Sequence, residues 1–345
     1  MTRLQIILFL IPLCLMSCTA SQMEEEFPTE EEQTAIGFNA KVQNSRAIAT
    51  LTDVQKGFGV WAFITDSVRT NYPYMENTLV EDTNEDGEWY YEDTKYWLYE
   101  TQFSFIATYP YDKDGNIYTI PTVDGQQTGA VELTLSETPS DIDYLVALSS
   151  VNTSDSIFNP SASVDLQFKH LLSNVSLNVW RDHGKHQNDQ MRVRKVTLSN
   201  IRKAGTYSSV ADAWAPTNDK LTMEYTNGDV ADDNNIGAAT KKGDSFEFSG
   251  TPSAPFSGVM LLPQTIDVSS NIVSLRIDYE LKRQNAADWE SAELETILPA
   301  ITWEKGKQYV YNVVLSSVTD ITIYYIQTKV DPWGTPQVGG TVIIK

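Results

Sequence analysis

Residues 164–179 read VDLQFKHLLSNVSLNV. Apolar and polar side chains alternate over Val164–Phe168 and again over Val175–Val179, and this period of two is that of a half-buried β-strand. The same alternation occurs at Ile36–Val42, and short β-prone runs such as Gly59–Thr65 recur between turn residues. Many short strands separated by turns are typical of β-sandwiches. The sequence therefore predicts an all-β fold of two tandem β-sandwich domains.

The composition limits both the size of the protein and its function. A chain of 345 residues corresponds to about two domains. Its 46 acidic and 25 basic side chains give a net charge of −21, which repels phosphate backbones, so we expect no nucleic-acid partner. After Cys14 and Cys18 the chain has no thiol for a disulfide, a nucleophile or a zinc site. We also expect no cofactor.

The first residues have the pattern of an export signal. Arg3 precedes an apolar stretch of 12 residues, Leu4–Leu15, which is too short to span a hydrocarbon core of about 30 Å. The segment Leu15–Cys18 (LMSC) resembles a bacterial lipobox, in which the cysteine is lipidated and becomes the new N-terminus. We expect lipid on Cys18, with an ordinary signal peptide and a chance cysteine as the alternative.

Four segments follow from these patterns. The stretch Asn152–Ser163 is rich in Ser, Asn, Thr and Pro and is the best domain boundary. We predict a lipoprotein signal peptide at residues 1–18, a tether and first strand at 19–46, an N-terminal sandwich at 47–163, and a C-terminal sandwich at 164–345.

Two short motifs could bind a metal ion, but each has a simpler explanation. His183 and His186 have the spacing of a ligand pair, yet no third histidine is nearby and the segment fits a solvated hairpin loop. Asp82, Asn84 and Asp86 match the start of a calcium loop, but we favour the alternative of an acidic hairpin turn. No nucleophile elbow, P-loop or dinucleotide fingerprint is present. We predict that the protein is not an enzyme and has no metal site.

Clustered aromatic residues give a further candidate site. Trp89–Tyr91 and Tyr96–Trp97 could form a platform that stacks on sugars. Inward packing in a sandwich core is the alternative, and we favour it. His170 lies between Phe168 and Leu171, and we expect it to be a packed, hydrogen-bonded core residue.

Several short motifs occur in a characteristic order. They are Phe58–Phe63, Tyr96–Trp97, Phe103–Pro110, Asp143–Ala147, Val164–Val175, Leu261–Gln264, Trp303–Tyr311 and Val330–Trp333. Their order and spacing resemble those of the fimbrillin family, the type V pilins of Gram-negative surface fimbriae, over essentially the whole chain. The resemblance implies transthyretin-like sandwiches and a lipoprotein precursor that the export machinery carries to the outer membrane at the cell surface.

The resemblance also implies proteolytic activation. In this family an Arg-specific protease cuts the loop after the first strand. Carried over to this chain, the cut falls between Arg46 and Ala47. The removed strand is Ile36–Val42, whose candidate groove-filling residues are Ile36, Phe38, Ala40 and Val42.

The vacated groove then accepts a strand from another pilin subunit, which gives a head-to-tail polymer. Here the implied donor strand contains Val342, Ile343 and Ile344. Gly and Pro residues before the terminal strand favour a mobile arm, while the alternative is that the last strands complete the second sandwich.

The physics of burial supports strand removal as an activating step. We expect Ile36, Phe38 and Val42 to face the core, and burial of each is worth about 1.5–3 kcal/mol. Their loss costs on the order of 5–9 kcal/mol, which is comparable to the net stability of a domain, and it unpairs a sheet edge. The predicted function is a structural fimbrial subunit that supports adhesion to an unknown glycan or host ligand. The alternative is a glycan-binding lipoprotein that stays anchored.

Overall fold

The computed structural model describes residues 33–42, 50–183, 188–226, 236–242, 245–315, 321–328 and 337–343. These residues form an almost entirely β structure, as predicted, with one short helix, α1 (Leu51–Gln55). None of the helices in this part of the chain is long and apolar enough to cross a membrane.

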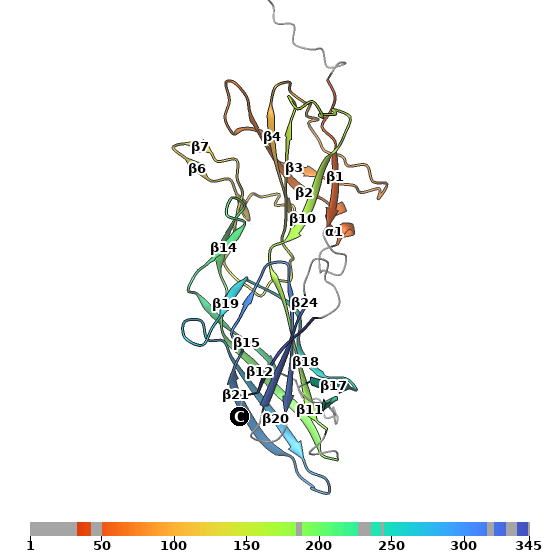
Figure 1. The fold of residues 1–345 in the computed structure, drawn as a ribbon, viewed down its shortest axis with the longest axis vertical. Helices are drawn as coiled ribbons and strands as arrows, with labels where there is room; N and C mark the ends of the chain where they lie inside the picture. Colours follow the sequence, from red (N-terminus) through yellow and green to blue (C-terminus); the bar gives the residue numbers. More distant parts are fainter. Residues whose placement is uncertain are drawn as a thin grey trace, which may run out of the picture. The chain divides into compact units, whose positions relative to one another are not determined.

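The first sheet has six strands and contains most of the N-terminal half of the chain (Figure 1). In spatial order they are β1 (Phe38–Val42), β10 (Val164–His170), β9 (Leu145–Asn152), β4 (Gln102–Tyr109), β2 (Phe58–Thr65) and β3 (Tyr72–Val80). All neighbours are antiparallel except β1 and β10, which are parallel. The first strand of the chain is therefore an edge strand.

Both faces of this sheet are covered at its centre, and the sequence of β2 reflects this. Val60 and Ala62 belong to one hydrophobic cluster, while Trp61 and Phe63 belong to another on the opposite face. A strand buried on both faces reads as a continuous apolar run, as FGVWAFIT does. In β10 every second residue is exposed instead, which explains its alternating sequence.

Smaller elements cover the two faces. A four-stranded sheet contributes side chains to the second cluster, in the order β14 (Ala213–Pro216), β13 (Gly205–Ser208), β8 (Glu132–Leu135) and β5 (Tyr118–Thr119). Helix α1 and the segment around Trp89–Leu98 contribute to the first. A separate two-stranded ribbon consists of β6 (Thr122–Val123) and β7 (Gln126–Gln127).

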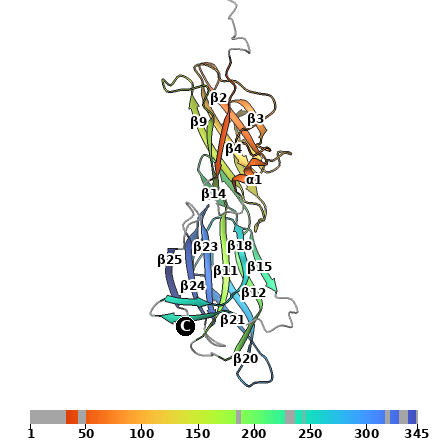
Figure 2. The ribbon, with the colours of Figure 1, turned by 90° about the vertical axis from the view of Figure 1, so that its right-hand side faces the viewer.

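A second pair of sheets encloses the largest hydrophobic cluster. One sheet has the order β17 (Ser245–Ser249), β16 (Ala238–Lys242), β11 (Ser173–Asp182), β23 (Gln308–Leu315), β24 (Ile321–Thr328) and β25 (Gln337–Ile343), with β18 (Ser253–Leu261) also paired to β11 (Figure 2). The other has the order β15 (Lys220–Thr226), β12 (Gln190–Arg202), β20 (Ser274–Lys282) and β21 (Glu290–Ile297). Strands β19 (Gln264–Ile266) and β22 (Ile301–Trp303) pair with each other in a separate two-stranded sheet.

The strand pairing corrects one detail of the predicted organisation. Strand β10 (Val164–His170), predicted as the start of the second sandwich, pairs with β1 and β9 in the first sheet. Strand β13 likewise pairs with β8. The chain therefore returns to the first sheet system after residue 163. The reason is that the buried face of β10 completes the cluster formed by β1, β2 and β4.

Candidate functional site

Strand β1 is held at the sheet edge by backbone and side-chain hydrogen bonds. It runs parallel to β10, with Phe38 opposite Val164. Just before it, the N–H of Ile36 donates to the carbonyl of Lys95 at 2.8 Å. The carbonyl of Ile36 in turn accepts from the hydroxyl of Tyr91 at 2.8 Å. The first strand thus lies in a groove, which we call the β1 groove, between β10 and the Tyr91–Lys95 segment.

The side chains of β1 fill this groove in the predicted alternation. Ile36, Phe38 and Ala40 are buried, with exposed fractions of 1%, 4% and 4%. Val42 is only half-buried and packs against the margin of the same cluster. The apolar contribution of the strand therefore comes mainly from Ile36 and Phe38, while Val42 faces the same core at its margin.

Phe38 makes the most extensive aromatic contacts of the strand. Its ring centre lies 5.9 Å from that of Phe105 and 5.6 Å from that of Tyr91, both in edge-to-face geometry. Lys41 lies on the opposite, exposed face and forms an ion pair with Asp165 at 3.6 Å. The two faces of β1 thus differ sharply: one is anchored in the core and the other is solvated.

The predicted cut lies just beyond the end of β1. Arg46 and Ala47 fall within residues 43–49, which lie outside the described residues. The described chain resumes at Thr50, whose N–H and hydroxyl donate to the Asp53 carboxylate at 2.9 and 2.8 Å and so cap α1. A chain cut after Arg46 would keep this capped helix four residues from its new end.

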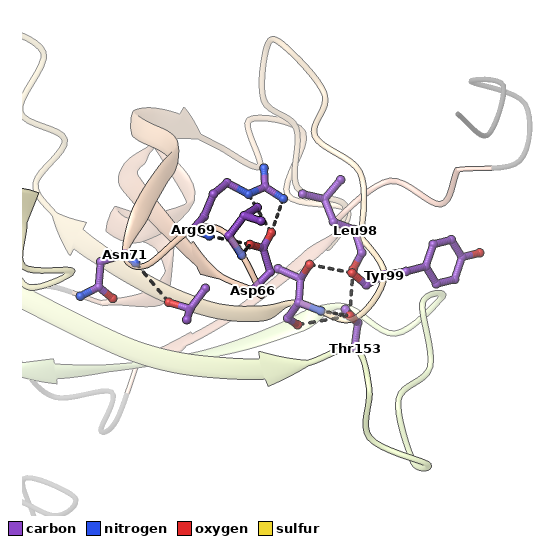
Figure 3. Close-up of polar contacts among 9 residues, drawn as sticks. Asp66, Arg69, Asn71, Leu98, Tyr99 and Thr153 are labelled. Carbon is purple, nitrogen blue, oxygen red and sulfur yellow. Dashed lines mark hydrogen bonds and ion pairs between the residues drawn. The ribbon is translucent and has the colours of Figure 1, made fainter. Parts of the chain in front are cut away.

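Arg69 is a useful contrast to Arg46, because it is held in a tight turn (Figure 3). The carboxylate of Asp66 accepts hydrogen bonds from the Arg69 guanidinium, with an Nε–Oδ2 distance of 2.7 Å, and from the Arg69 backbone N–H at 2.8 Å. The guanidinium beside Asp66 lowers the pKa of that carboxyl to about 2. A protease needs an extended segment around its target arginine, so this turn is a poor substrate.

The implied donor strand is paired within this chain. Val342 lies opposite Ile323 and Ile343 opposite Thr322, so β25 is antiparallel to β24 and forms the outer edge of its sheet. Ile344 and Cys18 lie outside the described residues. In the single chain β24 and β25 complete the sheet that contains β11 and β23, which is the alternative to a mobile arm. Donation to another subunit therefore requires β25 to separate from β24.

The predicted aromatic platform does not form with its tryptophans exposed. Trp97 is buried, and its ring lies 5.1 Å from that of Phe103. Trp89 is half-buried against Phe58, at 5.3 Å between ring centres. Inward packing, the favoured expectation, is confirmed for both.

Asp82 of the candidate calcium motif has a structural role, and the His183/His186 motif is only partly described. The Asp82 carboxylate accepts hydrogen bonds from the Gln55 side chain at 3.0 Å and from the backbone N–H of Gly87 at 3.1 Å, so it stabilises the turn. His186 lies outside the described residues. Across the described ranges, no group of three or more His, Cys, Asp or Glu side chains could hold a metal ion.

His170 is a core residue, as expected. Its Nδ1 lies 2.8 Å from Oδ2 of Asp143, and the side chains are only 2% and 0% exposed. The pair joins the end of β10 to the residues that lead into β9. The partner was not predictable from spacing, because Asp143 and His170 are 27 residues apart.

Comparison with known proteins identifies the family. A sequence model described as fimbrillin-like matches residues 45–333, which is most of the chain. The chain belongs to the fimbrillin-like family. This is a family of fimbrial proteins rather than of enzymes. No curated protein sequence matches this fimbrillin-like chain significantly.

One solved structure shares the fold, and others are more weakly similar. A fimbrial protein from Bacteroides vulgatus superposes with a TM-score of 0.60 at 17% identity, over 89% of this fimbrillin-like chain and 99% of its own. A putative cell adhesion protein from Bacteroides ovatus gives 0.49 at 17% identity, over 91% and 99%. A fimbrial assembly protein from Parabacteroides distasonis gives 0.42 at 12% identity, over 89% and 100%. The first similarity is high enough to show a shared fold.

Sequence reasoning missed the far wall of the β1 groove. Tyr91 and Lys95 bond to the backbone of Ile36, but both lie in an irregular segment without a periodic pattern. In the sequence, the high density of aromatic residues at Trp89–Trp97 indicates that this segment packs against a hydrophobic core. It does not indicate that the segment contacts the strand Ile36–Val42.

Proposed function

We propose that this chain is a structural subunit of a cell-surface fimbria, exported as a lipoprotein through Cys18, cut after Arg46, and polymerised by strand exchange. The burial of Ile36 and Phe38 in a strand at the edge of a sheet carries the proposal. The partners are other pilin subunits, an Arg-specific protease and the lipoprotein export machinery.

Removal of β1 would leave the subunit in need of a replacement strand. Burial of Ile36 and Phe38 is worth about 3–6 kcal/mol together, which is a large part of the 5–15 kcal/mol that typically stabilises a domain. The backbone groups of β10 that pair with β1 would lose their partners. An open edge beside an empty apolar groove favours binding of an incoming strand.

The replacement strand is proposed to be β25 of another subunit. It is an outer strand, so it can leave β24 without disrupting other pairings. Because the acceptor groove and the donor strand lie on different surfaces, the contact is heterologous and propagates as a filament. The precursor would lie at the outer membrane and the cleaved product in the fimbria.

The decisive test is the N-terminus and mass of the protein recovered from the cell surface, for wild type, Arg46→Ala and Arg69→Ala. We expect wild type and Arg69→Ala to begin at Ala47 and to give oligomer ladders on a gel. Arg46→Ala is expected to begin at Cys18 and to stay monomeric. Polymerisation of Arg46→Ala to the wild-type extent would overturn the proposal.

The donor role needs its own variant. A chain that ends at residue 336 lacks β25 but keeps the β1 groove. We expect it to be cut at Arg46 and to accept a strand from wild-type subunits, while adding no further subunit. Normal filament growth from this variant would assign the donor strand to another segment.

The tethered glycan-binding alternative loses its structural support, because it relied on exposed Trp89 and Trp97. Their packing against core aromatic rings leaves no tryptophan platform there.

A further inference from the structure

A pocket, which we call the β3 pocket, lies along β3 at the edge of the first sheet opposite to β1. Its volume is about 820 Å³, within the range of about 300–1,000 Å³ that is common for ligand sites. One wall is β3 itself, and the other is the segment Tyr90–Lys95. The same segment forms the far wall of the β1 groove, so it contributes to both hollows.

Hydrogen bonds between the two walls close the β3 pocket near both ends. At one end the N–H of Tyr90 donates to the carbonyl of Glu81 at 2.8 Å, and the N–H of Glu81 donates to the carbonyl of Tyr90 at 3.0 Å. Near the other end the hydroxyl of Tyr74 donates to the carbonyl of Tyr96 at 2.7 Å. A peptide strand therefore cannot pair with β3 past either end, and a ligand has to enter from the solvent side.

Tyrosine rings line the pocket from both walls. Tyr72 and Tyr90 are 53% and 47% exposed, so a ligand can reach them. The ring of Tyr91 lies deeper and is fixed by its contact with Phe38, at 5.6 Å between ring centres. Rigid aromatic faces bind the flat apolar side of a ligand at a small cost in conformational entropy.

The charged groups of the lining are mainly hydrogen-bond acceptors. Four carboxylates line the pocket, those of Glu76, Glu81, Glu92 and Asp93. None of these four forms an ion pair with another described residue. Lys95 is the one cation among the described lining residues, and its Nζ lies 5.9 Å from the ring centre of Tyr74. Four negative side chains and one positive side chain give the lining a net charge of −3, which repels an anionic ligand.

The positions of the two exposed rings favour a ligand longer than a single small cation. Tyr72 begins β3, and Tyr90 pairs with Glu81 just beyond the end of β3. With a rise of about 3.3 Å per residue, the two positions are about 25–30 Å apart along the strand. The rings of Tyr72 and Tyr90 therefore cannot enclose one ammonium group, whereas a chain of sugar units can contact both.

We propose that the β3 pocket binds an uncharged oligosaccharide. The apolar faces of its pyranose rings would lie on Tyr72 and Tyr90, and its hydroxyls would donate to the carboxylates of Glu76 and Glu92. A carboxylate accepts several hydrogen bonds, and charge strengthens each of them. The net negative charge of the lining disfavours saccharides that carry carboxylates. This binding goes beyond the proposed assembly function and does not depend on it.

The test is titration of the uncut chain with cellotetraose and with β-1,4-galactotetraose, followed by calorimetry and saturation-transfer NMR. Tetragalacturonic acid is the charged counterpart, and L-argininamide is the cationic probe. We expect at least one neutral tetrasaccharide to bind, and tetragalacturonic acid to bind at least about tenfold more weakly. Binding of neither neutral tetrasaccharide overturns the proposal. Equal binding of tetragalacturonic acid, or binding of L-argininamide alone, also overturns it.

Variants of the two exposed tyrosines assign the binding to this pocket. Tyr72→Ala and Tyr90→Ala each remove one ring and should weaken binding about three- to tenfold. Tyr99→Ala is the matched control, because Tyr99 is 79% exposed and is not part of the pocket lining, and it should have no effect. Thermal unfolding checks that each variant is folded. Unchanged affinity in folded Tyr72→Ala and Tyr90→Ala refutes the site, whether or not the chain is cut or polymerises.

A carboxylate variant tests the charge argument separately. Glu76→Gln keeps the shape of the side chain but removes its charge, so it should weaken binding of the neutral tetrasaccharide severalfold. It should also reduce the discrimination against tetragalacturonic acid. Glu100→Gln, which changes an exposed carboxylate outside the pocket lining, should do neither. Equal effects of Glu76→Gln and Glu100→Gln would contradict the role of the pocket carboxylates.

Discussion

Replacing Phe38 with alanine in the uncut chain measures how strongly β1 is held. The side chain is 4% exposed and touches two aromatic rings. Phe→Ala changes in a core cost about 3–5 kcal/mol. Because β1 is an edge strand and its groove can partly relax, we expect a value near the low end, about 3 kcal/mol.

Lys41→Ala is the matched control on the same strand. Lys41 points to solvent, and its ion pair with Asp165 joins side chains that are both 59% exposed. Such pairs contribute about 0–1 kcal/mol. The two variants therefore alter the same edge strand and differ in which face of β1 is changed.

The assay is urea unfolding followed by tryptophan fluorescence, before and after treatment with an Arg-specific protease. In the uncut chain, Phe38→Ala should lower the free energy of unfolding by about 3 kcal/mol, and Lys41→Ala by less than about 1 kcal/mol. After cutting and loss of β1, Phe38→Ala and wild type should be indistinguishable. Equal effects of the two variants in the uncut chain would refute the packing argument. A difference that persists after the cut would show that β1 stays bound.

Three further predictions concern buried and paired groups elsewhere. Asp143→Asn should lower the free energy of unfolding by about 1–3 kcal/mol, because it weakens the buried contact with His170, and urea unfolding measures this. Burial raises the pKa of the Tyr309 hydroxyl to about 12. Above about pH 10 the unfolded chain loses this proton while the folded chain keeps it, so the free energy of unfolding should fall as the pH rises. Tyr309→Phe should reduce this pH dependence in urea unfolding midpoints measured from pH 9 to 11.5. Arg69 lowers the pKa of the Asp66 carboxyl to about 2, so the ionised Asp66 stabilises the fold above about pH 4 and this stabilisation is lost as the pH falls through 2. Carboxyl NMR titration should find a higher pKa for Asp66 in Arg69→Ala. An unchanged pKa would contradict the role of the ion pair.

The sequence by itself determined the class of the fold and the buried face of its strands. The alternation in Ile36–Val42 and Val164–Phe168 predicted which side chains enter the core, because side chains of a strand point to opposite faces with a period of two. The apolar run of Gly59–Thr65 similarly predicted a strand, which the structure has at Phe58–Thr65. These are local properties, so a single sequence contains them.

Only the tertiary structure decided which strands are neighbours. The parallel pairing of β1 with β10 places Phe38 opposite Val164. The strand Val164–His170 therefore belongs to the first sheet, because the apolar face of this strand completes the core of that sheet. The contact of His170 with Asp143, 27 residues away, is of the same kind. Such contacts depend on the packing of distant segments against each other, and no periodicity within a segment encodes its partner.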